Sequence, residues 1–213
     1  MSYDYKRLTN FPEERQKIIY PYCFWNQVFT SEELDVICEI SANQELDTAA
    51  IFGASNNRTG FGEKNLTVRK SKTSIHNPNE ENSWIFKRLN SVIEMCNDRW
   101  YNFDLNGYNN YQYTEYHGAS NDHYDWHVDI DMSPLNTNTH SETRKLSISL
   151  LLNNEEDFTG GDLQIGHSQN YETPIMKKGT LVLFPSFQLH RVTPVTKGIR
   201  KSLVLWVVGP KFK

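Results

Sequence analysis

The sequence contains few cysteines and lacks long apolar runs. Three cysteines, Cys23, Cys38 and Cys96, are scattered through its 213 residues and form neither a CxxC pair nor a disulfide framework. The longest apolar run, residues 203–208, has the length of a strand, whereas a membrane helix needs about 18 residues. The first residues also lack the apolar core of a signal peptide. We therefore expect a cytoplasmic chain in a reducing compartment, with no membrane partner.

A surplus of basic residues is absent as well. The 22 lysine and arginine residues are outnumbered by 26 acidic ones, which leaves a formal net charge of −4. Proteins that bind nucleic-acid phosphates usually carry a basic surplus, so we expect no nucleic-acid partner, although Arg69, Lys70 and Lys72 form a local basic group. Hydrophobic residues make up 38% of the chain and aromatic residues 13%, values that exclude disorder as the dominant state.

The spacing of apolar residues predicts two helices in the first half of the chain. The first covers residues 30–43 and begins with a threonine–glutamate capping box. The second covers residues 80–101, and Asn77 or Asn79 can cap its start. Both helices carry their apolar residues on one face, so we expect them to pack against another layer of the protein.

One strand is predicted between the two helices, and after residue 105 the chain is dominated by predicted strands with no helices between them. Segments with β-rich composition and turn signals at their ends cover residues 66–74, 111–116, 146–152, 158–165, 179–184, 189–192 and 199–208. We expect a mainly β fold with flanking helices (α+β), built as a sandwich, barrel or jelly roll. Residues 1–213 would form a single domain, in which residues 1–105 provide helical support and lid strands and residues 106–213 form the β core.

Several histidines have an acidic residue two positions further on. The pairs are His123 with Asp125, His127 with Asp129, and His140 with Glu142. On a strand, residues i and i+2 point to the same side, so both members of a pair can bind one metal ion. Such a pair alone is weak evidence, because roughly one is expected by chance in this composition.

A third ligand would turn one of these pairs into a more specific site. Two histidines and one carboxylate can hold Fe(II) on one side and leave the opposite positions open. His190, at the end of a predicted strand and loop, is the candidate. Arg200 and Ser202 follow, and a hairpin of residues 189–193 and 199–207 would bring them near His190. A buried arginine beside a hydroxyl can pair with a carboxylate of a dicarboxylic acid.

Five segments then resemble a known family, in the order in which that family carries them. They are YHG at 116–118, WHVD at 126–129, KLSISLLLN at 145–153, FTGGDL at 158–163 and LFPSFQLHRVTPVTKGIRKS at 183–202. Over about residues 110–208 the chain resembles the 2-oxoglutarate- and Fe(II)-dependent oxygenases of the prolyl 4-hydroxylase-like group, including bacterial and phage PKHD-type hydroxylases. The resemblance implies a double-stranded β-helix (jelly roll) core.

The resemblance also assigns roles by position. It implies that His127, Asp129 and His190 are the iron ligands, and the tryptophan before His127 favours this histidine over His123. It implies that Arg200 and Ser202 bind the distal carboxylate of 2-oxoglutarate. Tyr116 would contact the same molecule, with Tyr113 or Tyr111 as alternatives. Fe(II), 2-oxoglutarate and O₂ are therefore the expected cofactors and cosubstrates, with ascorbate as an additional reductant.

The implied activity is hydroxylation of a C–H bond, with succinate and CO₂ as coproducts. A prolyl residue in a peptide or protein is the substrate that the resemblance favours, and the polar loops 51–65 and 132–143 would be lids over it. Another amino-acid residue or a small metabolite are alternatives. A cupin-like enzyme that does not use 2-oxoglutarate, or a non-catalytic β-sandwich binding module, would account for fewer of the residues.

Overall fold

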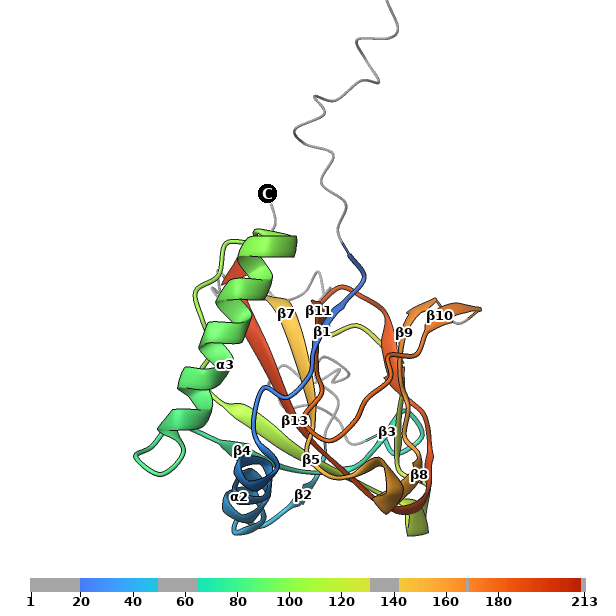
Figure 1. Cartoon of the computed structure of the whole chain (residues 1–213). Helices are drawn as coiled ribbons and strands as arrows, with labels where there is room; N and C mark the ends of the chain where they lie inside the picture. Colours follow the sequence, from blue (N-terminus) through green and yellow to red (C-terminus); the bar gives the residue numbers. More distant parts are fainter. Residues whose placement is uncertain (1–19, 50–64, 131–141, 168, 212–213) are drawn as a thin grey trace, which may run out of the picture.

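The computed structural model describes residues 20–49, 65–130, 142–167 and 169–211 (Figure 1). Two β-sheets face each other, and two helices cover the outer side of the larger sheet. This arrangement confirms the prediction of a mainly β fold with flanking helices. Of the two predicted lid loops, residues 51–64 and 132–141 lie outside the described residues, and residues 142–143 belong to a strand.

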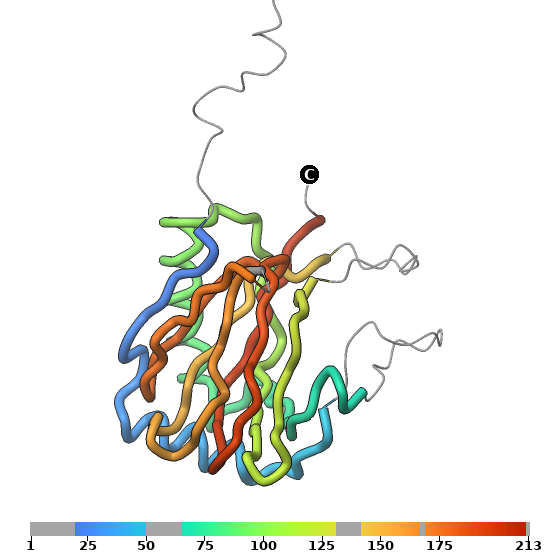
Figure 2. The backbone as a smooth tube through the Cα atoms, turned by 90° about the vertical axis from the view of Figure 1, so that its right-hand side faces the viewer, coloured from blue at the N-terminus to red at the C-terminus, as the bar shows by residue number. Residues whose placement is uncertain are grey.

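The larger sheet contains eight strands in the order β1-β11-β7-β13-β5-β4-β2, with β8 paired to the beginning of β13. Its strands are β1 (Cys23–Trp25), β2 (Asp47–Thr48), β4 (Lys72–His76), β5 (Tyr111–His117), β7 (Glu142–Leu151), β8 (Phe158–Gly160), β11 (Leu181–Pro185) and β13 (Val195–Pro210). Figure 2 shows β13 as the long red trace through the molecule. All of its pairings, with β5, β7 and β8, are antiparallel.

The smaller sheet contains five antiparallel strands in the order β10-β9-β12-β6-β3. They are β3 (Arg69–Lys70), β6 (His123–His127), β9 (Leu163–His167), β10 (Asn170–Glu172) and β12 (His190–Val192). Because this sheet lies opposite the larger one, side chains that point inward from both sheets share the space between them.

Two apolar cores result from these layers. The first lies between the helices and the larger sheet and includes Leu34, Ile37, Ile85, Leu89, Tyr111, Tyr113, Leu146, Ile148, Leu181 and Leu183. The second lies between the two sheets and includes Tyr116, Leu163, Ile165, Val182, Phe184, Val192 and Val195. On β11 successive residues alternate between the two cores, as the period of a strand requires.

Helix α2 (Ser31–Ala42) agrees with the prediction for residues 30–43. Thr30 accepts a hydrogen bond from the Glu33 backbone N–H at 3.2 Å, and the Glu33 carboxylate accepts one from the Thr30 N–H at 2.8 Å. This reciprocal pair is the predicted capping box. Neither helix in the described part of the chain combines the length and apolar character that crossing a bilayer requires.

Helix α3 (Ser83–Cys96) begins later than predicted, but the helical stretch continues in a different helical form to the predicted end at Tyr101. Asn82 occupies the N-cap position, without a side-chain capping bond, and a π-helical turn, Asn97–Tyr101, follows the helix. Asn79 was a predicted cap, but it exchanges side-chain-to-backbone hydrogen bonds with Asn82 at 2.8 and 3.0 Å. The Asn79 side chain thereby stabilises a local turn in place of the helix start.

Two predicted strands are each divided in the structure. The segment 66–74 forms β3 in the smaller sheet and β4 in the larger one, with a break at Ser71. The segment 158–165 forms β8 and β9, with a break at Gly161 and Asp162. Gly161 has a φ of +70°, a conformation that L residues rarely adopt. In both segments the chain passes from one sheet to the other, which a continuous strand cannot do.

The predicted hairpin of residues 189–193 and 199–207 is wrong. Strand β12 pairs with β6 and β9 in the smaller sheet, whereas β13 pairs with β5, β7 and β8. The turn between them therefore connects the two sheets. His190 and Arg200 consequently face the inter-sheet space from opposite sides, and strand pairing does not bring them together.

Candidate metal centre

Two histidines and an aspartate meet in the inter-sheet space. His127 ends β6 and is the register partner of His190 on β12, while Asp129 lies two residues beyond His127. One Asp129 oxygen is 3.6 Å from His127 Nε2, and the other is 3.5 Å from His190 Nε2. One possible ligand atom from each residue lies within 4.8 Å of the others. The structure thus brings together the three residues that the sequence indicated.

Backbone contacts orient both imidazoles toward the aspartate. His127 Nδ1 lies 2.7 Å from the carbonyl oxygen of Asp125, and His190 Nδ1 lies 2.9 Å from that of Gln188. A carbonyl oxygen only accepts hydrogen bonds, so each Nδ1 carries the proton and each Nε2 presents a lone pair. This is the tautomer that binds a metal ion through Nε2.

Asp129 is held by its own set of contacts. Its side chain accepts a hydrogen bond from Ser147 Oγ at 2.7 Å, and Ser147 Oγ lies 2.9 Å from Ser186 Oγ. The backbone N–H groups of Asp129 and Ile130 donate to the Ser186 carbonyl oxygen at 2.9 and 3.1 Å. The side chain of Arg144 donates to the Asp129 carbonyl oxygen at 3.4 Å. These contacts keep the carboxylate in place.

The protonation states suit metal binding. Burial, reinforced by the neighbouring His190, lowers the pKa of His127 from 6.5 to about 3, so the imidazole is neutral. Burial alone raises the pKa of Asp129, but the nearby His190 and His127 more than offset this effect and lower the pKa to about 2. A neutral imidazole and an ionised carboxylate are the forms in which these groups act as ligands.

The side chains of the competing pair, His123 and Asp125, contact backbone groups. The two ring nitrogens of His123 lie 3.0 and 3.2 Å from the carbonyl oxygens of Asn121 and Thr67. Asp125 accepts a hydrogen bond from the backbone N–H of Trp126. Both ring nitrogens of His123 therefore face backbone carbonyl oxygens and not a position shared with Asp125. His140, the histidine of the third pair, lies outside the described residues.

Arg200 is a buried cation on the other wall of the inter-sheet space. Its side chain is 2% exposed, and Nη1 donates to Ser202 Oγ at 3.1 Å. Burial lowers its pKa, and Tyr116 and Asp162 counteract this effect. Among the residues that the structure describes, no carboxylate lies within ion-pair distance of the guanidinium. A buried guanidinium of this kind is suited to a carboxylate that arrives with a ligand.

Tyr116 connects Arg200 with the metal centre. It is the register partner of Arg200, whose Cζ lies 5.7 Å from the centre of the Tyr116 ring. The ring also lines the small cavity beside the two histidines and the aspartate. The alternatives Tyr113 and Tyr111 belong to the core on the helix side of the same sheet. The structure therefore places Tyr116, and neither alternative, beside Arg200.

Several residues at the centre were missed from the sequence. Tyr124 stacks on His127 with ring centres 3.4 Å apart, and the guanidinium of Arg69 lies 4.6 Å from the Tyr124 ring centre. Arg69 is buried and lines the cavity, whereas Lys72 of the same basic group is exposed. Arg144 lies 4.1 Å from the Trp206 ring centre, and Trp206 lines the cavity as well. The local sequence around Tyr124, Arg69 and Arg144 did not assign these residues to the centre.

The fold and the site together define a class of protein: a two-sheet β protein that carries two histidines and one carboxylate between its sheets. Comparison with known proteins supports this class. The model of the 2OG-Fe(II) oxygenase superfamily matches residues 111–208. Over these residues, slightly less than half of the chain, the protein is similar to the 2OG-Fe(II) oxygenase superfamily. Two imidazoles and one carboxylate form a donor set that fits Fe(II), the metal named in the description of that superfamily.

Curated relatives match over short segments. A PKHD-type hydroxylase of Synechococcus sp. (strain JA-2-3B'a(2-13)) is 44% identical over 62 residues, which are 29% of this chain and 28% of that protein. A PKHD-type hydroxylase of Pseudoalteromonas atlantica is 33% identical over 97 residues, 45% of this chain and 41% of that protein. The chain therefore spans less than half the length of these relatives.

Solved structures match over most of the chain. The prolyl hydroxylase of Trichoplax adhaerens, in complex with a peptide fragment of the hypoxia inducible factor oxygen degradation domain, has a TM-score of 0.67 and 19% identity, and covers 88% of this chain and 83% of its own. A Pseudomonas putida prolyl-4-hydroxylase has a TM-score of 0.66 and 18% identity. The match covers 90% of this chain and 94% of that protein's chain. This likeness confirms the predicted jelly-roll core.

Proposed function

We propose that this chain is an Fe(II)- and 2-oxoglutarate-dependent dioxygenase that hydroxylates a prolyl residue in a peptide or protein, with succinate and CO₂ as coproducts. The observation that carries the proposal is the convergence of His127 Nε2, the Asp129 carboxylate and His190 Nε2 on one buried point. Two imidazoles and one carboxylate hold Fe(II) and leave coordination positions for cosubstrate and O₂.

In this proposal His127, Asp129 and His190 hold the iron. When bound there, Fe(II) with 2-oxoglutarate supplies the activation of O₂ that a C–H hydroxylation needs. The protein orients the ligands: the carbonyls of Asp125 and Gln188 fix the imidazole tautomers, and Ser147 fixes the carboxylate. The apolar residues between the sheets, such as Phe184 and Leu163, exclude water from the space beside the iron.

Arg200, Ser202 and Tyr116 are the proposed partners of 2-oxoglutarate. The guanidinium can form two parallel hydrogen bonds to the distal carboxylate, and the Ser202 hydroxyl lies at its side. Arg200 already carries its charge in a buried position without a carboxylate partner among the described residues, so a bound carboxylate would compensate it. This feature supports 2-oxoglutarate use over a cupin-like site that lacks a dicarboxylate.

A peptide substrate is supported by the cavity wall and by the relatives. Trp206 lines the cavity, and its indole N–H is a buried donor without a partner in the described part of the chain. A peptide carbonyl that enters the cavity could accept that hydrogen bond, and a prolyl ring could pack on the Trp206 face opposite Arg144. The Trichoplax enzyme is named as a prolyl hydroxylase and was solved with a peptide.

The first test is anaerobic addition of Fe(II) and then 2-oxoglutarate to the metal-free protein. We expect the weak visible charge-transfer band of chelated cosubstrate, its loss in His127→Ala and its weakening in Arg200→Ala. Iron binding without a band would contradict 2-oxoglutarate use and leave the cupin-like enzyme, and no iron binding would leave the binding module.

The second test identifies the substrate. Aerobic incubation with a library of proline-containing peptides should produce succinate in a ratio of one to each peptide that gains an oxygen atom, as followed by mass spectrometry. Turnover should last longer when ascorbate is present, because a reductant restores iron that has been oxidised. Succinate production that only a small metabolite or a peptide without proline stimulates would overturn the prolyl assignment.

A further inference from the structure

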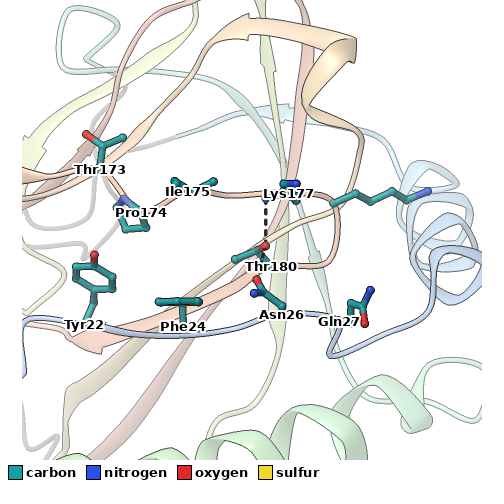
Figure 3. A pocket seen from close by; sticks show the side chains of 10 residues that line it. Tyr22, Phe24, Asn26, Gln27, Thr173, Pro174, Ile175, Lys177 and Thr180 are labelled. Carbon is teal, nitrogen blue, oxygen red and sulfur yellow. Dashed lines mark hydrogen bonds between the residues drawn. The ribbon is translucent and has the colours of Figure 1, made fainter.

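Residues 173–178, which belong to the segment between β10 and β11, form a strap across the edge of the two sheets. It contains no regular secondary structure. Five of its six residues, all except Met176, line an open hollow of about 690 Å³ on the outside of the molecule, together with Tyr22 and Phe24 from the opposite side (Figure 3). This hollow shares no lining residue with the cavity at the metal centre.

The side chain of Met176 points into the protein, whereas the neighbouring residues of the strap line the outer hollow. It packs against the core between the sheets, and its Sδ accepts a contact from Arg200 Nη2 at 3.9 Å. The adjacent Ile175, by contrast, is 83% exposed. The strap therefore inserts one side chain between the sheets, and that side chain ends at the guanidinium that we propose for the cosubstrate carboxylate.

The Arg200 side chain lies against two groups on fixed backbone, Ser202 and Gly161, and against the flexible side chain of Met176. Ser202 Oγ accepts from Nη1, and Gly161 lies against the side-chain stem, where an added Cβ would come within 2.8 Å of Arg200 Cδ. Both belong to backbone that strand pairing or a tight turn holds in place. Met176 has three rotatable side-chain bonds and belongs to a strap without strand pairing.

A thioether is a weak hydrogen-bond acceptor, whereas a carboxylate binds a guanidinium strongly. A carboxylate that approaches Arg200 therefore competes successfully for Nη2, and the methionine side chain becomes the wall against which the end of the ligand rests.

We propose that Met176 is a specificity-determining residue that limits the length of the 2-oxo dicarboxylic acid bound between the metal centre and Arg200. The inference rests on the proposed function, since it assumes that a 2-oxo acid spans these two groups. In the native protein the wall fits 2-oxoglutarate better than 2-oxoadipate, which is longer by one C–C bond of about 1.5 Å. Met176→Ala removes three heavy atoms from the wall and creates room for the longer acid.

The test is binding of both acids to the Mn(II)-loaded full chain, measured by calorimetry, so that no turnover is needed. The native protein should prefer 2-oxoglutarate by about tenfold or more, the usual effect of one methylene in a fitted pocket. In Met176→Ala this ratio should shift toward 2-oxoadipate by about tenfold or more. Met176→Leu, which keeps the bulk without the sulfur, should retain the native ratio, and Ile175→Ala should behave like the native protein.

The outcomes separate the inference from the function on which it rests. If the native protein binds neither acid in the presence of Mn(II), the proposed function is wrong and the inference is wrong with it. If the native protein binds 2-oxoglutarate and Met176→Ala keeps the native ratio within about twofold, only the inference is wrong. Should Met176→Ala fail to fold, as judged by its circular dichroism, the smaller truncation Met176→Val must show the shift in the same direction.

Discussion

His127 and His190 are register partners on neighbouring antiparallel strands, with ring centres 4.1 Å apart. Each presents Nε2 to a different oxygen of Asp129. The candidate metal centre is thus built across one strand pair of the smaller sheet, and a shift of that register by one residue would turn one imidazole to the other side of the sheet.

Removal of one imidazole should remove metal binding. We expect His127→Gln to weaken Mn(II) affinity by roughly a hundredfold or more, because even loss of an outer partner of a ligand costs about ten- to a hundredfold. Electron paramagnetic resonance of free Mn(II) measures this affinity. His123→Gln is the matched control, since both ring nitrogens of His123 face backbone carbonyl oxygens. Equal losses in the two variants would contradict the assignment of the centre.

Ser147→Ala should weaken metal binding without removing it. The hydroxyl donates to the Asp129 carboxylate at 2.7 Å, and its loss leaves the carboxylate free to turn. We expect Mn(II) affinity to fall by about ten- to a hundredfold. Ser91→Ala, on the exposed side of α3, changes the same atoms away from the site and should have no effect on affinity. An unchanged affinity in Ser147→Ala would show that the backbone alone positions Asp129.

Gly161→Ala should weaken 2-oxoglutarate binding while metal affinity stays near that of the native protein. The new Cβ would lie 2.8 Å from Arg200 Cδ, so the guanidinium must move, and misplacement of such a group by about 1 Å costs up to a hundredfold. Calorimetry with the Mn(II)-loaded protein measures both affinities.

Gly107→Ala is the control for backbone strain in that experiment. Gly107 also has a positive φ, of +119°, but an added Cβ there would contact nothing within 4 Å. Both variants should lose stability, since alanine is disfavoured at positive φ. Only Gly161→Ala should lose cosubstrate affinity, and an equal loss in both would attribute the effect to strain alone.

His76 should make the stability of the protein depend on pH near neutrality. It is 1% exposed, stacks on Tyr111 and bonds to Ser74, and burial lowers its pKa below the ordinary 6.5. Below pH 6.5 the unfolded chain therefore takes up a proton that the folded chain does not, so this contribution favours folding above pH 6.5 and is lost as the pH falls. Thermal melts between pH 7.5 and 5 should show a smaller decrease for His76→Phe than for the native protein.

Much of the local structure was predictable because it depends on neighbours in the chain. The capping box of Thr30 and Glu33 and the apolar face of α2 act over three or four residues, and both predictions are confirmed. The alternation on β11, with Leu183 toward the helices and Val182 toward the smaller sheet, follows from the period of a strand.

The strand breaks and pairings were not predictable in the same way. Residues 66–74 and 158–165 have the composition of continuous strands, yet each passes from one sheet to the other. The hairpin expected between the strands of His190 and Arg200 does not form, because these strands belong to different sheets. Composition reports that a segment favours an extended conformation, but partners far away in the chain decide which sheet it joins.

The sequence by itself determined the kinds of residue at the candidate site and their local order: a histidine two positions before an aspartate, a later histidine, and an arginine two positions before a serine. The tertiary structure decided which of them meet. It placed His127, Asp129 and His190 within 4.8 Å, excluded His123, and brought Met176 to Arg200 across 24 positions of the chain. The physical reason is that a side chain's chemistry is a local property, whereas its distance from another side chain depends on how the whole chain packs.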